Sequence, residues 1–221
     1  MKKFIMAAAM LLGLATAANA QNISFKADAN LGFSNATVKI GDYKPSTDLK
    51  LGYRINLGME MPFAGDLRSG QFYFSPGLTF LSKGHKFDMG PLSVKAMPHY
   101  LQIPLQLGAR WQFADNMGVS LQFGPYLAVG LGGKYTIEGQ AFGQRASTDI
   151  DYFGDNTNKR FDFGATIQAA FEYSRYYFQV GTDFGFLNTA QKEDISLNGS
   201  KVMNIADNKN YDFFLGVGVH F

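Results

Sequence analysis

The sequence contains no cysteine, which excludes disulfide bonds, thiolate catalysis and an acylated lipoprotein amino terminus. It has only three histidines, and none is spaced with carboxylates as in a metal site. Beyond residue 20 there is no apolar run long enough for a membrane helix. No basic run or patch points to nucleic acid, and nothing indicates a cofactor. Hydropathy alone would therefore predict a soluble exported protein.

The first twenty residues have the layout of a secretory signal peptide. Lys2 and Lys3 precede an apolar stretch over residues 4–18, and Ala18 and Ala20 form a small-x-small cleavage site. The stretch is too short for a comfortable membrane anchor, so cleavage is expected after Ala20. Residues 1–20 are then the signal peptide and residues 21–221 form one domain. Without the two lysines, 18 of the 20 basic residues remain, against 18 acidic ones.

The mature chain alternates apolar and polar residues with a period of two, the pattern of β-strands with two different faces. No segment shows a sustained helical period. Long polar connections, over residues 35–47, 83–96, 133–160 and 188–209, alternate with short ones at 62–70, 114–117 and 174–175. The alternation predicts eight strands, at about residues 23–33, 49–60, 71–80, 101–113, 119–132, 161–173, 176–186 and 211–221.

The composition of the two faces distinguishes two architectures that share this alternation. A soluble sandwich or lipocalin-like barrel turns its apolar face inward, and a membrane barrel turns it outward. Here the apolar face is bulky and nearly free of charge, whereas the polar face is rich in glycine, as in Gly216 and Gly218. Small residues suit the cramped interior of an eight-stranded barrel. We therefore predict an all-β, eight-stranded, antiparallel, closed transmembrane β-barrel of up-and-down topology.

Closure is required because every backbone polar group in lipid must be paired. The last strand, ending at Phe221, is expected to pair with the first. Both ends of the barrel domain then lie on the side of the short turns, which is the periplasmic side in outer-membrane barrels. The long connections are expected to be extracellular.

At this point the chain resembles a known family, the PorT-like outer-membrane β-barrel proteins of Bacteroidota. The fourth strand carries the most similar motif, with Tyr100-Leu101 followed by Ile103-Pro104-Leu105, and it departs from the family at Gln102. The resemblance implies the bacterial outer membrane, with outer-membrane lipid as its surroundings. It also implies that the aromatic Phe221 is an assembly signal for the barrel-assembly machinery.

The polar face carries charged residues that would point into the lumen. Because buried charges must be paired, we interpret them as an ion network that plugs the barrel. The alternative is an ion or proton path, which the bulky Tyr73, Tyr126, Tyr177 and Phe214 oppose. The predicted lumen ions are Lys26, Asp28, Lys50, Arg54, Glu60, Arg110, Asp162, Glu172, Asp183 and Asp212.

One pair within this network can be predicted from the first hairpin. If the hairpin is symmetric about Gly41, opposed residues have numbers that sum to 82, and Asp28 faces Arg54. Only slips by an even number of residues keep both charges out of lipid. We expect Arg54 to contact Asp28 or another inward carboxylate such as Glu60.

Three other groupings could carry chemistry. Ser82, His85 and Asp88 suggest a hydrolase, but a triad is a geometry and not a cluster in sequence. Asp149, Asp151 and Gly154 match part of a calcium loop, with Phe153 at a ligand position and Arg160 at the place of the closing Glu. The polar segments 133–160 and 188–209 could bind a partner or be plain surface.

No catalytic, cofactor or metal site is expected from these patterns. The favoured function is a non-enzymatic structural, interaction or adhesion role, with an extracellular or periplasmic protein partner that the sequence does not identify. The alternative is an accessory role in protein export or assembly at the outer membrane. An outer-membrane enzyme that hydrolyses lipid or peptide is a third hypothesis.

Overall fold

A computed structural model describes residues 23–40, 47–89, 92–141, 144–154, 158–189, 194–197 and 200–221. The regular elements in these ranges are all β-strands. No helix within them is long and apolar enough to cross a bilayer. The predicted signal peptide, with Ala18 and Ala20, lies outside the described residues.

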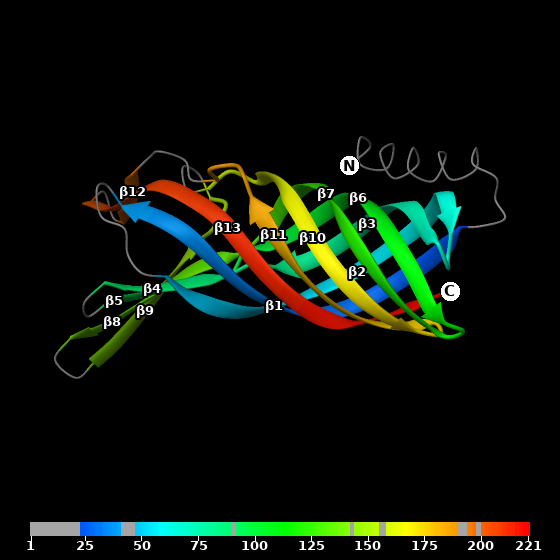
Figure 1. The fold of residues 1–221 in the computed structure, drawn as a ribbon. Coiled ribbons are helices and arrows are strands. Elements are labelled where there is room, and N and C mark those ends of the chain that lie inside the picture. Colours follow the sequence, from blue (N-terminus) through cyan, green and yellow to red (C-terminus); the bar gives the residue numbers. More distant parts are fainter. Residues whose placement is uncertain are drawn as a thin grey trace.

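Eight long strands form a closed antiparallel ring, which confirms the predicted fold class (Figure 1). Each strand pairs with its neighbour in the ring, and β13 pairs with β1 to close it. Turns of two or three residues join β2 to β3, β6 to β7 and β10 to β11 at one end. The eight strands are β1 (Ser24–Ile40), β2 (Thr47–Asp66), β3 (Gly70–Ser82), β6 (His99–Ala114), β7 (Met117–Gly132), β10 (Phe161–Tyr173), β11 (Tyr176–Gly185) and β13 (Ser200–His220).

The two faces of the ring are oriented as in a membrane barrel. Large apolar side chains are outside, with exposed fractions of 61% for Leu57 and Phe123, whereas Gln102 and Asp162 inside are fully buried. A soluble sandwich or lipocalin-like barrel would show the opposite distribution. The outer face therefore suits hydrocarbon and the inner face is a polar core.

The register between β1 and β2 corrects the predicted one. Opposed residues have numbers that sum to 84 and not 82, so Asn30 faces Arg54 and Asp28 faces Asn56. The difference is a slip of two residues, which leaves every side chain on its predicted face. The apolar pattern alone cannot distinguish two registers related in this way.

The predicted loops 83–96, 133–160 and 188–209 contain strands, which is a second correction. The start of β2 pairs with β4 (His85–Met89). After β4, the strands β5 (Leu92–Ala96), β8 (Lys134–Ala141) and β9 (Gln144–Asp151) follow in the sheet, each paired with the one before it. We call these four strands the extension, which projects beyond the ring (Figure 1). A fifth short strand, β12 (Asp194–Leu197), pairs with β13. Each of these strands has only four to eight residues, and they lie in segments that the sequence analysis took as polar connections because they lack the long apolar alternation of the ring strands.

An aromatic cluster joins the extension to the lumen. The Tyr135 and Tyr152 rings stack with centroids 4.7 Å apart, and Phe153 meets Tyr100 edge-on at 5.6 Å. A side chain at Gly130 would collide with the Phe153 ring, so glycine there allows the ring to lie against β7. These buried rings and Tyr126 belong to one hydrophobic cluster, at the end of the ring opposite the short turns.

Candidate functional site

Most of the charged side chains predicted to face the lumen are buried inside the ring. They form groups that follow one another along the barrel axis, starting from the end with the short turns. Eight of the ten are buried, and the Arg110 side chain is 13% exposed. Lys50 is half-buried and makes no ion pair among the described side chains. The buried eight are Lys26, Asp28, Arg54, Glu60, Asp162, Glu172, Asp183 and Asp212.

The group at the turn end is centred on Arg110. Its guanidinium lies 2.7 Å from the Glu172 carboxylate and 2.5 Å from that of Glu60. Lys26 approaches Glu60 on the other side, at 3.5 Å, and donates a hydrogen bond to Gln122 at 3.0 Å. Two cations and two carboxylates therefore balance at this end.

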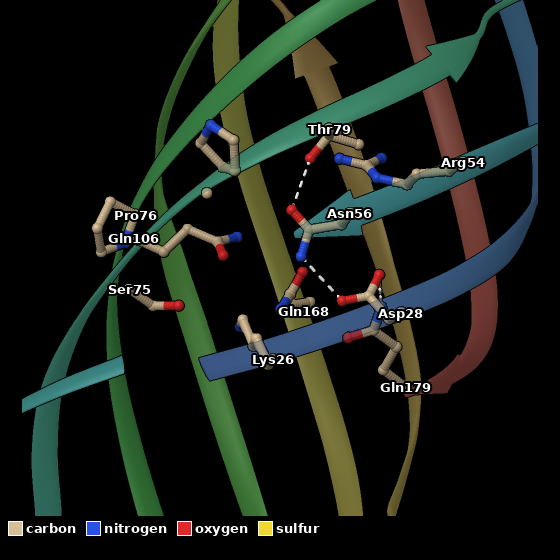
Figure 2. Close-up of a pocket in the computed structure, with 12 residues that line it drawn as sticks. Lys26, Asp28, Arg54, Asn56, Ser75, Pro76, Thr79, Gln106, Gln168 and Gln179 are labelled. Carbon is tan, nitrogen blue, oxygen red and sulfur yellow. Dashed lines mark hydrogen bonds between the residues drawn. The ribbon is translucent and has the colours of Figure 1, made fainter. Parts of the chain in front are cut away.

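Asp28, in the middle of the lumen, is stabilised by neutral donors. Asn30, Asn56 and Gln179 donate amide hydrogen bonds to its carboxylate at 2.7, 2.9 and 3.0 Å, and the Tyr177 hydroxyl donates at 2.9 Å. Figure 2 shows Asp28 on β1 with Asn56 bonded to it from β2. The predicted Asp28–Arg54 ion pair is wrong, because the slip in register places Asn56 opposite Asp28.

Arg54 instead pairs with two inward carboxylates from distant strands, which confirms the second form of the prediction, a contact with another inward carboxylate, although the partner is not Glu60. Its guanidinium lies 2.9 Å from Asp183 of β11 and 3.3 Å from Asp212 of β13. The two carboxylates belong to directly opposed residues, so Arg54 compensates both. Its guanidinium also lies 4.1 Å from the centroid of the Phe214 ring.

The last group contains a cation that the sequence analysis missed. Lys83 is buried and lies 3.4 Å from Asp162, with its ammonium 4.6 Å from the Tyr126 ring centroid. It lies in the connection predicted over residues 83–96. The signal was present, because Lys83 continues the odd-numbered lumen face of β3 that runs through Thr79. Two further steps of two residues along this face lead from Thr79 to Lys83.

The lumen between these groups is filled. The cavity drawn in Figure 2 has a volume of about 10 Å³ and is lined by Lys26, Asp28, Arg54 and nine further residues. A volume of roughly 10–15 Å³ is what one water molecule needs. This cavity is therefore about large enough for one water molecule.

A wider cavity opens at the turn end, and it contains a serine and a histidine that the sequence analysis did not bring together. The cavity has about 350 Å³, and Ser24, Arg110 and His220 line it. His220 Nδ1 lies 3.5 Å from Ser24 Oγ and 3.9 Å from the Glu60 carboxylate, while Nε2 faces Arg110 at 3.5 Å. A catalytic triad places the hydroxyl and the carboxylate on opposite ring nitrogens. Here both approach the same nitrogen, an arrangement that suits an ion network.

The other predicted groupings lie at the extension. Asp149 accepts hydrogen bonds from Lys134 at 3.1 Å and Thr136 at 2.9 Å, and Asp151 accepts one from the backbone N–H of Phe153 at 2.9 Å. Neighbouring donors therefore occupy both carboxylates of the partial calcium pattern. In the described ranges, no three His, Asp or Glu side chains are arranged to hold a metal.

Of the hydrolase grouping, Ser82 and His85 are buried at the start of the extension, and the Asp88 side chain lies outside the described residues. His85 packs edge-on against Tyr135, with ring centroids 6.4 Å apart. Burial lowers the pKa of His85 to about 4, because the imidazolium would lose its hydration.

The buried imidazole predicts that the extension loosens in acid. The pKa of His85 is lower in the folded than in the unfolded state, so its contribution is complete above about pH 6.5 and is lost as pH falls towards 4. The full loss amounts to about 3 kcal/mol. Amide-exchange protection of β4 and β5, corrected for intrinsic rates, should fall between pH 7 and 4.5. His85→Gln should abolish the pH dependence, and equal protection of the wild-type protein at both pH values would contradict it.

Comparison with known proteins gives one family. The family described as outer membrane protein beta-barrel domain matches residues 18–191. No curated protein matches the chain. Because the family match covers most of the chain, it defines both the fold family and the cellular location.

Several solved outer-membrane structures are similar to this chain at low identity. The outer membrane enzyme PagL is 12% identical over 88% of this chain and 98% of its own, with a TM-score of 0.49. OprG from Pseudomonas aeruginosa is 10% identical over 90% of this chain and 95% of its own, with a TM-score of 0.45. Ail of Yersinia pestis, an attachment invasion locus protein, is 14% identical over 89% of this chain and 99% of its own, with a TM-score of 0.36. These similarities carry no information on activity.

The closed ring, its apolar outer face and the family match agree with one another. Each is an expected property of a protein that crosses lipid with strands. The chain belongs to the outer membrane protein beta-barrel domain family, and its place is the bacterial outer membrane.

Proposed function

We propose that this protein is a non-enzymatic outer-membrane barrel whose interior is a structural plug and whose extension contacts partners outside the cell. The filled lumen is the observation that carries the proposal. Charged groups from six of the eight strands meet inside, and the cavity between Lys26, Asp28 and Arg54, of about 10 Å³, has room for one water. A barrel with this interior serves as a scaffold and not as a pore.

The finer family assignment is part of the same proposal. The Tyr100-Leu101 and Ile103-Pro104-Leu105 motifs support a PorT-like barrel of Bacteroidota, exported through a cleaved signal peptide. The barrel-assembly machinery would act on it during biogenesis. Phe221 suits such a role, since its side chain is 76% exposed beyond β13.

The plug predicts an electrically silent protein. Purified protein in planar bilayers should produce no stable single-channel currents at neutral pH, because the ion groups and rings leave no continuous water path. A general porin reconstituted in the same membranes provides the positive control. Large, stable currents from the folded wild-type protein would overturn the plugged-lumen interpretation.

The contact role of the extension can be tested without disturbing the barrel. Ile137 and Thr148 are directly opposed on β8 and β9, so residues 138–147 can be replaced by Asn-Gly, a two-residue hairpin turn. Tyr135 and the aromatic cluster stay in place. We expect normal outer-membrane levels and heat-modifiability. Adherence of expressing bacteria to one another or to a protein-coated surface should fall, and unchanged adherence would count against a contact role.

A further inference from the structure

A groove crosses the lipid-facing surface where the ring closes. It has a volume of about 710 Å³, and its lining is almost entirely apolar. It runs over β10, β11, β13, β1 and β2 next to the turn end of the barrel. Its lining includes Ala27, Ala29, Val217 and Val219 on the two closing strands.

The strand register explains why the surface is hollowed there. We call a row of directly opposed residues on neighbouring strands a rung. One rung crosses five strands and consists of Phe171, Phe178, Val217, Ala29 and Ile55. This rung therefore has two phenylalanine rings on β10 and β11, a small alanine on β1, and a branched isoleucine on β2. This difference in side-chain height makes a floor on β1 and β13 with a wall on β10 and β11.

The next rung towards the turn end repeats the pattern. Tyr173, Tyr176, Val219 and Ala27 follow one another in the same order. Tyr173 and Tyr176 are 57% and 60% exposed, and their phenol groups suit the boundary between hydrocarbon and headgroups. An elongated apolar groove in this position is bounded by tyrosines at the membrane surface.

A cation lies at that boundary. The two-residue turn between the tyrosines consists of Ser174 and Arg175, and both are exposed. The backbone carbonyl of Arg175 accepts a hydrogen bond from His220 N–H at 2.8 Å, which holds the turn beside the end of β13. Within the described ranges, the Arg175 guanidinium has no ion-pair partner. A phosphate is the kind of group that such a guanidinium binds.

We propose that this groove binds one phospholipid of the periplasmic leaflet, with an acyl chain over Ala27 and Ala29 and the headgroup phosphate at Arg175. The occupant follows from the surroundings, since the groove faces hydrocarbon in the outer membrane and its open end carries a positive charge. An anionic headgroup adds attraction of about fivefold for one basic residue at the membrane surface. The site stands apart from the lumen and does not depend on the role of the extension.

Native mass spectrometry of the mature barrel tests the proposal. Protein would be released from nanodiscs of phosphatidylglycerol and phosphatidylcholine, and the retained lipids counted. We expect one retained phosphatidylglycerol per barrel. Ala29→Phe should reduce retention of both lipids about tenfold, the effect of roughly ten lost carbon–carbon contacts. Arg175→Gln should reduce retention of phosphatidylglycerol about fivefold.

Matched controls separate the site from general effects. Ala165→Phe places the same ring on the lipid-facing side of β10 outside the groove, and Arg68→Gln removes an exposed arginine from the β2–β3 turn. Both should retain lipid as the wild-type protein does, and heat-modifiability reports folding for all variants. Equal retention by Ala29→Phe and Ala165→Phe would overturn the groove. Equal retention by Arg175→Gln and Arg68→Gln would overturn the headgroup contact.

Discussion

Replacing Arg54 by methionine is expected to destabilise the folded barrel by about 3–5 kcal/mol. The guanidinium is the shared partner of Asp183 and Asp212, which are opposed on adjacent strands and almost fully buried. Methionine keeps much of the side-chain volume but removes the one cation within ion-pair distance of both carboxylates among the described side chains. Their mutual repulsion and lost hydration oppose folding.

The measurement is urea unfolding of the detergent-folded barrel, followed by gel mobility and tryptophan fluorescence. Adding Asp183→Asn and Asp212→Asn to Arg54→Met should restore much of the lost stability, because amides tolerate burial without a cation. Arg68→Met in the exposed β2–β3 turn should change little. If the Arg54→Met barrel were as stable as the wild-type protein, the contacts of Arg54 with Asp183 and Asp212 would not be a source of stability.

Replacing Gly216 by alanine is expected to weaken closure of the ring, at a cost of about 1–3 kcal/mol. A Cβ atom there would lie 2.2 Å from the backbone oxygen of Ala29 and 2.6 Å from the Asn30 Cα. Both are backbone atoms of β1, so no side chain can rotate away. The seam between β13 and β1 must widen instead, which weakens its hydrogen bonds.

The control is Gly132→Ala on β7, because an added Cβ there would meet no atom within 4 Å. Amide exchange should show faster opening of β1 and β13 in Gly216→Ala and unchanged exchange in Gly132→Ala. The unfolding midpoint should fall in the first variant only. Equal behaviour of the two variants would contradict close packing at the seam.

The number of ring strands could be predicted from the period-two pattern, and sidedness from the composition of its two faces. Closure then followed, because an open sheet edge cannot stay unpaired in lipid. A one-residue error would place charges such as Asp183 in lipid, so the pattern is strongly constrained. Register was not predictable to better than two residues, because an even slip moves no side chain across the sheet. The ion partners of Arg54 were missed for a related reason. They lie across the lumen on β11 and β13, and a hairpin argument reaches only adjacent strands.

The neutral side chains of the lumen were also missed. Asn56 and Gln179 decide how Asp28 is stabilised, but amides on a polar face give no sequence signal of their own. The extension was missed because its strands are short and lie in polar segments without the long apolar alternation of the ring. Lys83 differs from these, because it continues the odd-numbered, lumen-facing side of β3 and is therefore predictable from the alternation.

The partners in the lumen are far apart along the chain, and this separation has a kinetic consequence. Arg54 meets residues 129 and 158 positions later, and Asp28 meets Tyr177 149 positions later. A sheet that has formed only its amino-terminal strands carries these charges without their partners. Loop-closure entropy must be overcome before such remote contacts can stabilise anything, so intermediates gain little from the network. The interior therefore stabilises the complete ring selectively, and partial sheets remain high in free energy until β13 arrives.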